Sequence, residues 1–189
     1  MSRRKSLKAT AIATFLMMFG GVAYAQLNQW STQIKGPDVF GETTVIAAIE
    51  GDLEEVLGIQ CISGEPIELA ILSPATQEEL YELSKPGGSY PVDLLVKVDS
   101  GAVQKFDAQI EKWNNKYKGV VFTGRTPELV ALIRSIGKAK HIINVGTERD
   151  GIHGGTAAFG VIGSASAMNT LIKNCDLDHI KDTDTPDPK

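Results

Sequence analysis

Two cysteines, Cys61 and Cys175, are the residues of this chain with the most distinctive chemistry. A cysteine can serve as a nucleophile, a metal ligand or half of a disulfide. Two thiols are too few for a four-thiolate zinc site, and no histidine cluster lies beside either of them. In an oxidising compartment, a structural disulfide between the two is therefore the expected state.

The histidines and carboxylates do not form a recognisable catalytic or metal-binding motif. His141, His153 and His179 neither repeat at i, i+4 nor occur in an H-E-x-x-H frame, so no metal is assigned, although a site assembled from distant segments stays open. Two carboxylates could meet in space as a glycosidase pair. The acids considered for such a pair are Asp38, Asp52, Glu54, Glu55, Asp93 and Asp99.

Serine and glycine motifs likewise indicate structure more than catalysis. No Gly-x-Ser-x-Gly elbow occurs, and Ser164 is expected to act as a helix N-cap. Residues 151–155 (Gly-Ile-His-Gly-Gly) could approach a phosphate closely, but no Gly-Lys-Ser/Thr follows, so a loop is favoured. We therefore assign no catalytic residue and no cofactor.

A short basic and aromatic segment is the surface that we would test first for a partner. It contains Lys112, Trp113, Lys116 and Tyr117. Aromatic residues combined with cations are common at protein interfaces. The alternative is an ordinary solvated face of a helix or loop.

The N-terminus predicts export. Four bases without an acid precede an apolar run from Ala9 to Val22, and Ala23-Tyr24-Ala25 then has the small-x-small pattern of a cleavage site. The run is too short for a membrane anchor and contains Gly20-Gly21. We expect residues 1–25 to be a cleavable signal peptide. The Ser-Arg-Arg-Lys start also resembles a twin-arginine signal, but general secretion is favoured, and either route leads to the bacterial periplasm or outside the cell.

Removal of the signal changes the charge. The full chain has 189 residues and a net charge of −4. Residues 1–25 contain four bases and no acid, so cleavage leaves 15 bases, 23 acids and a net charge of −8. A strongly acidic domain is a poor ligand for nucleic acid or anionic membrane, and basic protein surfaces are the expected partners.

Strand patterns dominate the first half of the mature chain. Residues 92–99 alternate between apolar and polar side chains, and residues 103–106 are expected to return as a hairpin. Further strands are predicted over residues 43–49, 56–62, 67–71, 119–122 and 141–145. These segments position Cys61 within a strand.

Helices are predicted at three places. Thr76 to Leu83 forms a short one. Thr126-Pro127-Glu128 provides an N-terminus, and an apolar stripe then runs to Gly137, which marks the end. The last helix begins at Gly163-Ser164 and places Cys175 on its buried face. The expected fold is α+β: residues 26–175 form one globular domain, a mostly antiparallel β-sheet with two or three helices packed on it. Residues 176–189, with five aspartates, are expected to be an acidic disordered tail.

Several spaced motifs resemble a known kind of exported protein. Val96-Lys97-Val98-Asp99 ends a strand, and the chain closes on Phe159-x3-Gly163-x3-Ala167-x3-Leu171-x3-Cys175. This pattern is similar to small VasI/TagO-like type VI secretion accessory proteins and, more distantly, to invasion-associated locus B-like proteins. The resemblance implies a β-rich exported domain, an early cysteine paired with a late one, and an accessory role without catalytic residues.

Three functions remain open from the sequence. The favoured one is a periplasmic, non-enzymatic accessory protein that binds an envelope or secretion-system component. The second is a small envelope hydrolase or cell-wall-fragment binder, which would need convergent acids in a cleft and a raised carboxyl pKa. The third is an exported enzyme inhibitor with a protruding loop, for which residues 151–155 are the candidate.

Overall fold

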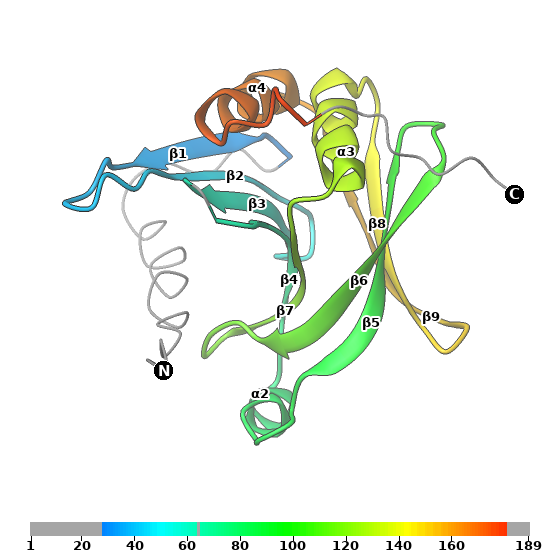
Figure 1. Ribbon diagram of the computed structural model, residues 1–189. Helices are drawn as coiled ribbons and strands as arrows, with labels where there is room; N and C mark the ends of the chain where they lie inside the picture. The colour runs from blue at the N-terminus through cyan, green and yellow to red at the C-terminus, as the bar shows by residue number, and fades with distance from the viewer. Residues whose placement is uncertain (1–27, 64, 181–189) are drawn as a thin grey trace, which may run out of the picture.

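The computed structural model describes residues 28–63 and 65–180. Within them, nine strands form one antiparallel sheet accompanied by three helices, which confirms the expected α+β class (Figure 1). The strands are β1 (Ser31–Lys35), β2 (Thr44–Glu50), β3 (Val56–Ile62), β4 (Ile67–Pro74), β5 (Tyr90–Val98), β6 (Val103–Lys112), β7 (Tyr117–Gly124), β8 (Ile143–Arg149) and β9 (Ile152–Phe159). The helices are α2 (Gln77–Leu83), α3 (Pro127–Lys138) and α4 (Ser164–Asn174).

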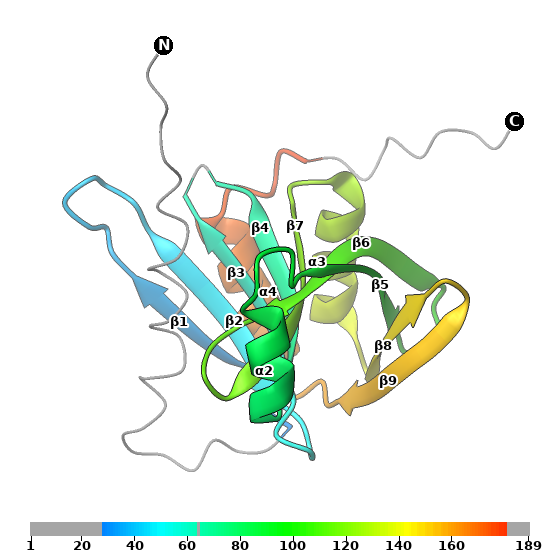
Figure 2. The same ribbon diagram turned by 90° about the horizontal axis from the view of Figure 1, so that it is seen from below.

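The sheet joins two meanders and a hairpin. Its order is β1-β2-β3-β4-β7-β6-β5-β8-β9, so β7 pairs with β4 and the β8–β9 hairpin extends the sheet beyond β5. The helix α2 links β4 to β5, and α3 links β7 to β8. The sheet curves around α3 and α4, which cover one face, whereas α2 lies at the other side of the molecule (Figures 1 and 2). The face turned away from α3 and α4 is called the outer face below.

The helix α3 packs its predicted apolar stripe against the sheet. The Thr126 hydroxyl accepts a hydrogen bond from the Leu129 N–H at 3.3 Å and Pro127 opens the helix, as expected. The stripe is fully buried and consists of Leu129, Leu132, Ile133 and Ile136. The helix continues to Lys138, so Gly137 does not end it. Instead Gly137 permits close helix packing, because a Cβ there would lie 3.1 Å from the Met168 Cβ of α4.

The helix α4 begins at Ser164 as predicted, but the expected N-cap role of Ser164 is wrong. The N-cap is Gly163, whose φ of 81° is left-handed and which makes no side-chain cap bond. Ser164 is the first helical residue and is buried. The chain needs glycine at 163 because a Cβ there would also approach the Trp30 carbonyl oxygen to 3.0 Å.

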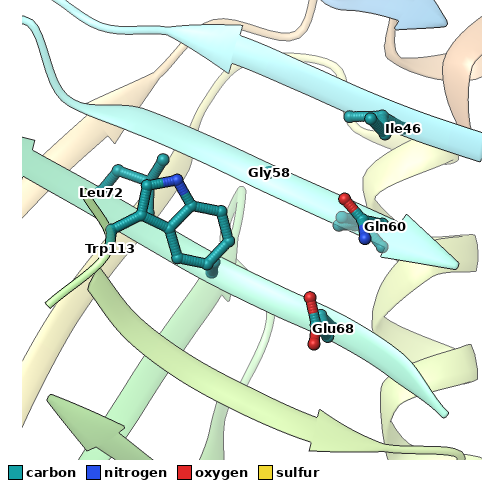
Figure 3. A pocket seen from close by; sticks show the side chains of 8 residues that line it. Ile46, Gly58, Gln60, Glu68, Leu72 and Trp113 are labelled. Atoms are coloured by element: carbon teal, nitrogen blue, oxygen red, sulfur yellow. The ribbon is translucent and has the colours of Figure 1, made fainter. Parts of the chain in front are cut away.

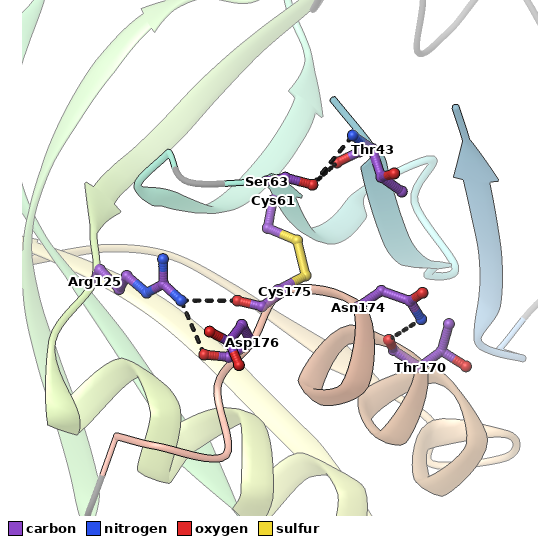
Figure 4. The surroundings of a disulfide bond; sticks show 8 residues. All are labelled: Thr43, Cys61, Ser63, Arg125, Thr170, Asn174, Cys175 and Asp176. Carbon is purple, nitrogen blue, oxygen red and sulfur yellow. Dashed lines mark hydrogen bonds between the residues drawn. A yellow bond between two sulfur atoms is a disulfide. The ribbon is translucent and has the colours of Figure 1, made fainter. Parts of the chain in front are cut away.

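The predicted disulfide is present. It joins Cys61 of β3 to Cys175, 114 residues later at the end of α4 (Figure 4). Closing so long a loop stabilises the fold by about 4–5 kcal/mol in the chain-entropy model. The bond ties the last helix to the sheet.

The structure extends beyond Cys175, so the predicted start of a disordered tail at residue 176 is wrong. Leu177 is 0% exposed within the core. Arg125 donates to the carbonyl oxygens of Cys175 and Asp176 at 2.9 Å each, and Arg134 donates to those of Leu177 and Ile180 at 3.3 and 3.0 Å. Residues 176–180 are therefore packed, and the remainder of the predicted tail lies outside the described residues.

The first described residues connect the two ends of the sheet. Trp30, just before β1, is buried and donates its indole N–H to the Gly160 carbonyl at 3.1 Å and its backbone N–H to that of Ile162 at 2.9 Å. Both acceptors follow β9, the opposite edge strand. The predicted signal peptide lies outside the described residues. No helix in the described part of the chain has the length and apolar character needed to cross a membrane.

Candidate interaction surfaces

The basic and aromatic segment predicted as a partner surface is the tight turn between β6 and β7. The Asn114 side-chain oxygen accepts hydrogen bonds from the N–H groups of Lys116 and Tyr117 at 2.8 and 2.9 Å, a typical Asx-turn arrangement. Lys112 and Lys116 are exposed. Tyr117 is only 5% exposed, so it supports this surface from beneath and offers a partner little area.

Two lysines at this turn, Lys116 and Lys118, are paired with acids. The Lys116 ammonium lies 3.2 Å from a Glu54 carboxylate oxygen and 5.1 Å from the centre of the Tyr117 ring, and the bond to Glu54 raises the pKa of Lys116. The Lys118 ammonium binds Glu79, which lowers the pKa of Glu79 to about 2. The surface is therefore a mixture of charges and not a basic patch.

Trp113 leans from this turn over the outer face of the sheet and borders a shallow pocket, partly open to solvent, whose cavity volume is only about 20 Å³ (Figure 3). The pocket is lined by Ile46, Gly58, Ile59, Gln60, Glu68, Ala70, Leu72 and Trp113. Its exposed wall is apolar, and the indole N–H of Trp113 is buried without a hydrogen-bond partner in the described residues. The pocket is too small for a ligand larger than about one or two water molecules.

A second pocket, of about 620 Å³ including open solvent, lies over β5, β6 and β8. It brings together Asp93, Asp107 and Glu148, because Asp93 is the cross-strand neighbour of both other acids. Asp93 forms an ion pair with Lys105 at 2.6 Å, and Glu148 contacts His153 at 3.3 Å. Of the six acids considered in the sequence, only Asp93 lines this pocket.

Other acids from that set have structural partners. Asp52 accepts a hydrogen bond from the Asn28 amide at 3.0 Å, and Asp99 accepts from the N–H groups of residues 140–142 at 2.8–3.0 Å. Those backbone bonds lower the pKa of Asp99. Burial raises the pKa of Glu55 and Glu111, but neither residue lines a pocket described above. The two carboxyl groups with a raised pKa therefore lie apart from the pocket that holds Asp93, Asp107 and Glu148.

The histidines stay apart. His153 contacts Glu148, His179 contacts Asp176 at 3.1 Å, and His141 donates its backbone N–H to Asp99. In residues 28–63 and 65–180, no group of three or more His, Cys, Asp or Glu side chains is placed to hold a metal ion.

The most exposed apolar side chains lie on a segment that sequence reasoning missed. The loop between β1 and β2, residues 36–42, projects from the sheet at one side of the molecule (Figure 2). At its tip Val39 is 92% exposed and Phe40 is 84% exposed. The sequence signal was available: two large apolar residues stand between Gly-Pro-Asp and Gly-Glu, a turn context that cannot bury them in a strand. We call residues 36–42 the apolar loop.

The glycine-rich segment 151–155 is a hairpin and not the expected loop. Gly151 turns with φ 77°, and Ile152 already begins β9, which pairs with β8. Sequence analysis missed this strand because glycine is depleted in strands. Ile152, 73% exposed, is at the tip of this hairpin.

Comparison with known proteins does not assign the chain to a family. No protein-family model matches it, and no curated protein or solved structure is significantly similar to it.

Proposed function

We propose that this protein is an exported, non-enzymatic accessory protein that binds another protein of the bacterial envelope. The observation that carries the proposal is the exposure of Val39 and Phe40 at the tip of the apolar loop. Hydrophobic side chains in contact with water cost free energy, and the fold gains nothing from placing two of them adjacent on a projecting loop. Large apolar or aromatic side chains of this kind are typical anchors of protein interfaces.

The proposed location rests on the N-terminal sequence and on the disulfide. The basic segment, apolar run and Ala-Tyr-Ala pattern support signal-peptide cleavage after Ala25. The Cys61–Cys175 bond is compatible with an oxidising periplasmic or extracellular compartment. A direct test is to express the full chain in a bacterium, fractionate the cells and determine the N-terminal residue of the exported form. We expect Gln26.

The partner can be sought by photo-crosslinking in living cells. A photoreactive phenylalanine analogue is placed separately at Phe40, at Lys112 and at Tyr81, an exposed residue of α2 that serves as the control. We expect one discrete protein adduct from at least one of the first two positions and none from Tyr81. Failure to obtain a protein adduct from any described surface position would contradict the accessory role.

A second candidate function is binding or hydrolysis of cell-wall fragments, favoured by the three carboxylates of the pocket over β5, β6 and β8. It predicts that purified mature protein clears or binds peptidoglycan and that Asp93→Asn with Asp107→Asn abolishes the effect. The matched control is Asp52→Asn, which lies outside the pocket. Retention of the effect in the double variant would remove this candidate.

The apolar loop also meets the requirement for an enzyme inhibitor, because it projects from the domain as such a segment must. The crosslinked partner decides between the two roles. If that partner is an enzyme whose turnover falls when mature protein is added, then binding amounts to inhibition; otherwise the accessory role stands.

A further inference from the structure

The apolar loop is held in one conformation by its own hydrogen bonds. The Asp38 carboxylate accepts from the N–H groups of Phe40 and Glu42 at 2.8 and 2.9 Å. The Asp38 N–H donates to the Glu42 carbonyl at 3.0 Å, and the Gly41 N–H donates to the Asp38 carbonyl at 3.0 Å. Four bonds around one residue close the base of the loop beneath Val39 and Phe40.

Glycines at two points make this conformation possible. Gly36 has φ 107°, and a Cβ at that position would lie 2.4 Å from the Glu42 carbonyl oxygen. Gly41 has φ 81°. Both angles are in the region that favours glycine. The backbone that carries the two apolar side chains is consequently set relative to β1 and β2 before any partner is bound.

An exposed apolar loop could insert into a membrane or into a pocket of another protein. The charge around the tip favours one of these two. Asp38 and Glu42 against Lys35 give residues 35–42 one net negative charge, and the domain left after the predicted cleavage carries −8. Insertion into an anionic bilayer needs basic residues beside the apolar ones. An acidic loop on an acidic domain instead complements a protein surface with basic side chains.

We propose that the apolar loop is a preformed knob that inserts Phe40, supported by Val39, into an apolar pocket of a protein whose rim is basic. Asp38 is a positioning residue: it holds the backbone that presents Phe40 and does not itself enter the pocket. This inference rests on the proposed function and specifies its binding surface. Because hydrogen bonds already order the backbone of the knob, little backbone entropy is lost when it binds.

The test is a competition against crosslinking from position 40. Cells or envelope extracts containing the photoreactive variant are illuminated in the presence of purified mature competitor proteins, and the yield of the protein adduct is measured. The competitors are the wild type, Phe40→Ala, Asp38→Ala, Asp38→Asn and, as a matched control, Tyr81→Ala. Intact mass and circular dichroism establish that each competitor is folded and has its disulfide.

Wild type and Tyr81→Ala should suppress the adduct at equal concentrations. Phe40→Ala should need about 30-fold more protein, the loss expected for an aromatic hot spot. Asp38→Ala should need roughly 5–10-fold more, because the loop must then be ordered on binding. Asp38→Asn should lose less than Asp38→Ala, since its amide oxygen can accept the same two hydrogen bonds and only the negative charge that faces the basic rim is removed.

Other outcomes overturn the inference in identifiable ways. If Asp38→Asn is as weak as Asp38→Ala, Asp38 acts through its charge and not by positioning. If position 40 yields lipid adducts, or if mature protein floats with vesicles of phosphatidylethanolamine and phosphatidylglycerol in a Phe40-dependent manner, the loop is a membrane anchor. If Lys112 yields the adduct and Phe40 does not, the knob fails while the proposed function stands. No protein adduct at any position contradicts both.

Discussion

Several carboxylates of this chain bind backbone N–H groups, a role that their residue type alone does not reveal. Asp38 holds the apolar loop, Asp99 holds residues 140–142, and Glu79 accepts from the N–H of Thr76 at 2.8 Å while the Thr76 hydroxyl accepts from the Glu79 N–H at 3.2 Å. The acids of the sequence were considered as a catalytic pair because acids are needed for that chemistry. Which of them reaches a backbone donor depends on turns that form only in the fold.

Glu79 makes the stability of the protein sensitive to acid. Its folded pKa, about 2, lies below its ordinary value of 4.5, owing first to the Lys118 ammonium and then to the Thr76 N–H. The ionised form is thus stabilised by folding, and this contribution is present above pH 4.5 and lost as the pH falls from there to about 2. Because Glu79 is on the surface, solvent screening limits the ionic part to under about 1 kcal/mol.

Two substitutions at Glu79 separate the stability that comes from its ion pair with Lys118 from the stability that comes from its bond to the Thr76 N–H. Glu79→Gln keeps an oxygen for the Thr76 N–H, whereas Glu79→Ala removes it; we expect losses of about 0.5 and about 1 kcal/mol at pH 7. Urea unfolding at pH 7 and at pH 3 measures them. If Glu79→Gln lowers the free energy of unfolding equally at pH 7 and at pH 3, the ion pair between Glu79 and Lys118 does not contribute.

Glycines on the outer face of the sheet respond differently to an added methyl group. A Cβ at Gly58, in the floor of the Trp113 pocket, would meet only the Ala47 carbonyl oxygen at 4.0 Å. Gly58→Ala should therefore stabilise the protein by about 0.5–1 kcal/mol, through reduced freedom of the unfolded chain. The matched control is Gly119→Ala, whose Cβ would lie 3.1–3.3 Å from Leu72, Val121 and Trp113. It should not stabilise, and thermal unfolding compares the two.

At the scale of elements, sequence patterns found the segments whose side chains determine their structure. The alternation in β5 and the apolar stripe of α3 are properties of the segments themselves, because each buries one face. The strands β1 and β9 were missed: β1 is largely polar, β9 begins among glycines, and both are ordered by pairing with β2 and β8. A strand that is ordered by pairing with its neighbour, and not by burying one face, carries no alternating pattern in its own sequence.

At the β6–β7 turn, a strand that is longer than predicted changes the geometry of the candidate site. The hairpin strand predicted over residues 103–106 extends to Lys112 as β6, and this extension turns Trp113 onto the outer face beside Leu72. In the structure Lys112, Trp113, Lys116 and Tyr117 lie at one turn, as their closeness in the sequence predicts. The sequence could not show that Tyr117 is buried, because the apolar cluster that covers it lies on the outer face and is formed by residues of β2, β4 and β7.

The disulfide should contribute strongly to the attachment of α4. Replacing both cysteines by alanine, Cys61→Ala with Cys175→Ala, should lower the free energy of unfolding by about 3–5 kcal/mol, since the unfolded chain is no longer constrained. Denaturant unfolding of mature protein measures the change. Hydrogen exchange should become faster in α4 before it changes in β5, because α4 loses its covalent link to the sheet. Equal acceleration throughout the sheet would contradict a local role for the bond.

At the scale of the whole molecule, the segment after the disulfide completes the core. Leu177 is buried against the same core that contains Cys61 and Cys175, and the carbonyl groups around it are bound by Arg125 and Arg134. The composition of residues 176–189 is acidic and poor in apolar side chains, so the sequence predicted disorder for all of it. Burial of the single Leu177 side chain orders the start of this segment. The sequence does not reveal that burial, because it depends on the neighbouring α3 and α4.

Two truncated chains test which part of the C-terminal segment contributes to stability. A mature chain that ends at Ile180 should unfold at the same denaturant concentration as the full mature protein. A chain that ends at Cys175 should be less stable by about 3 kcal/mol, because it loses the buried Leu177 and the carbonyl acceptors that Arg134 binds. Leu177→Ala in the full-length mature protein should reproduce 2–4 kcal/mol of this loss without altering the chain end. If Leu177→Ala is neutral, the arginine contacts and not the leucine hold the segment, and Arg134→Gln should then account for the difference.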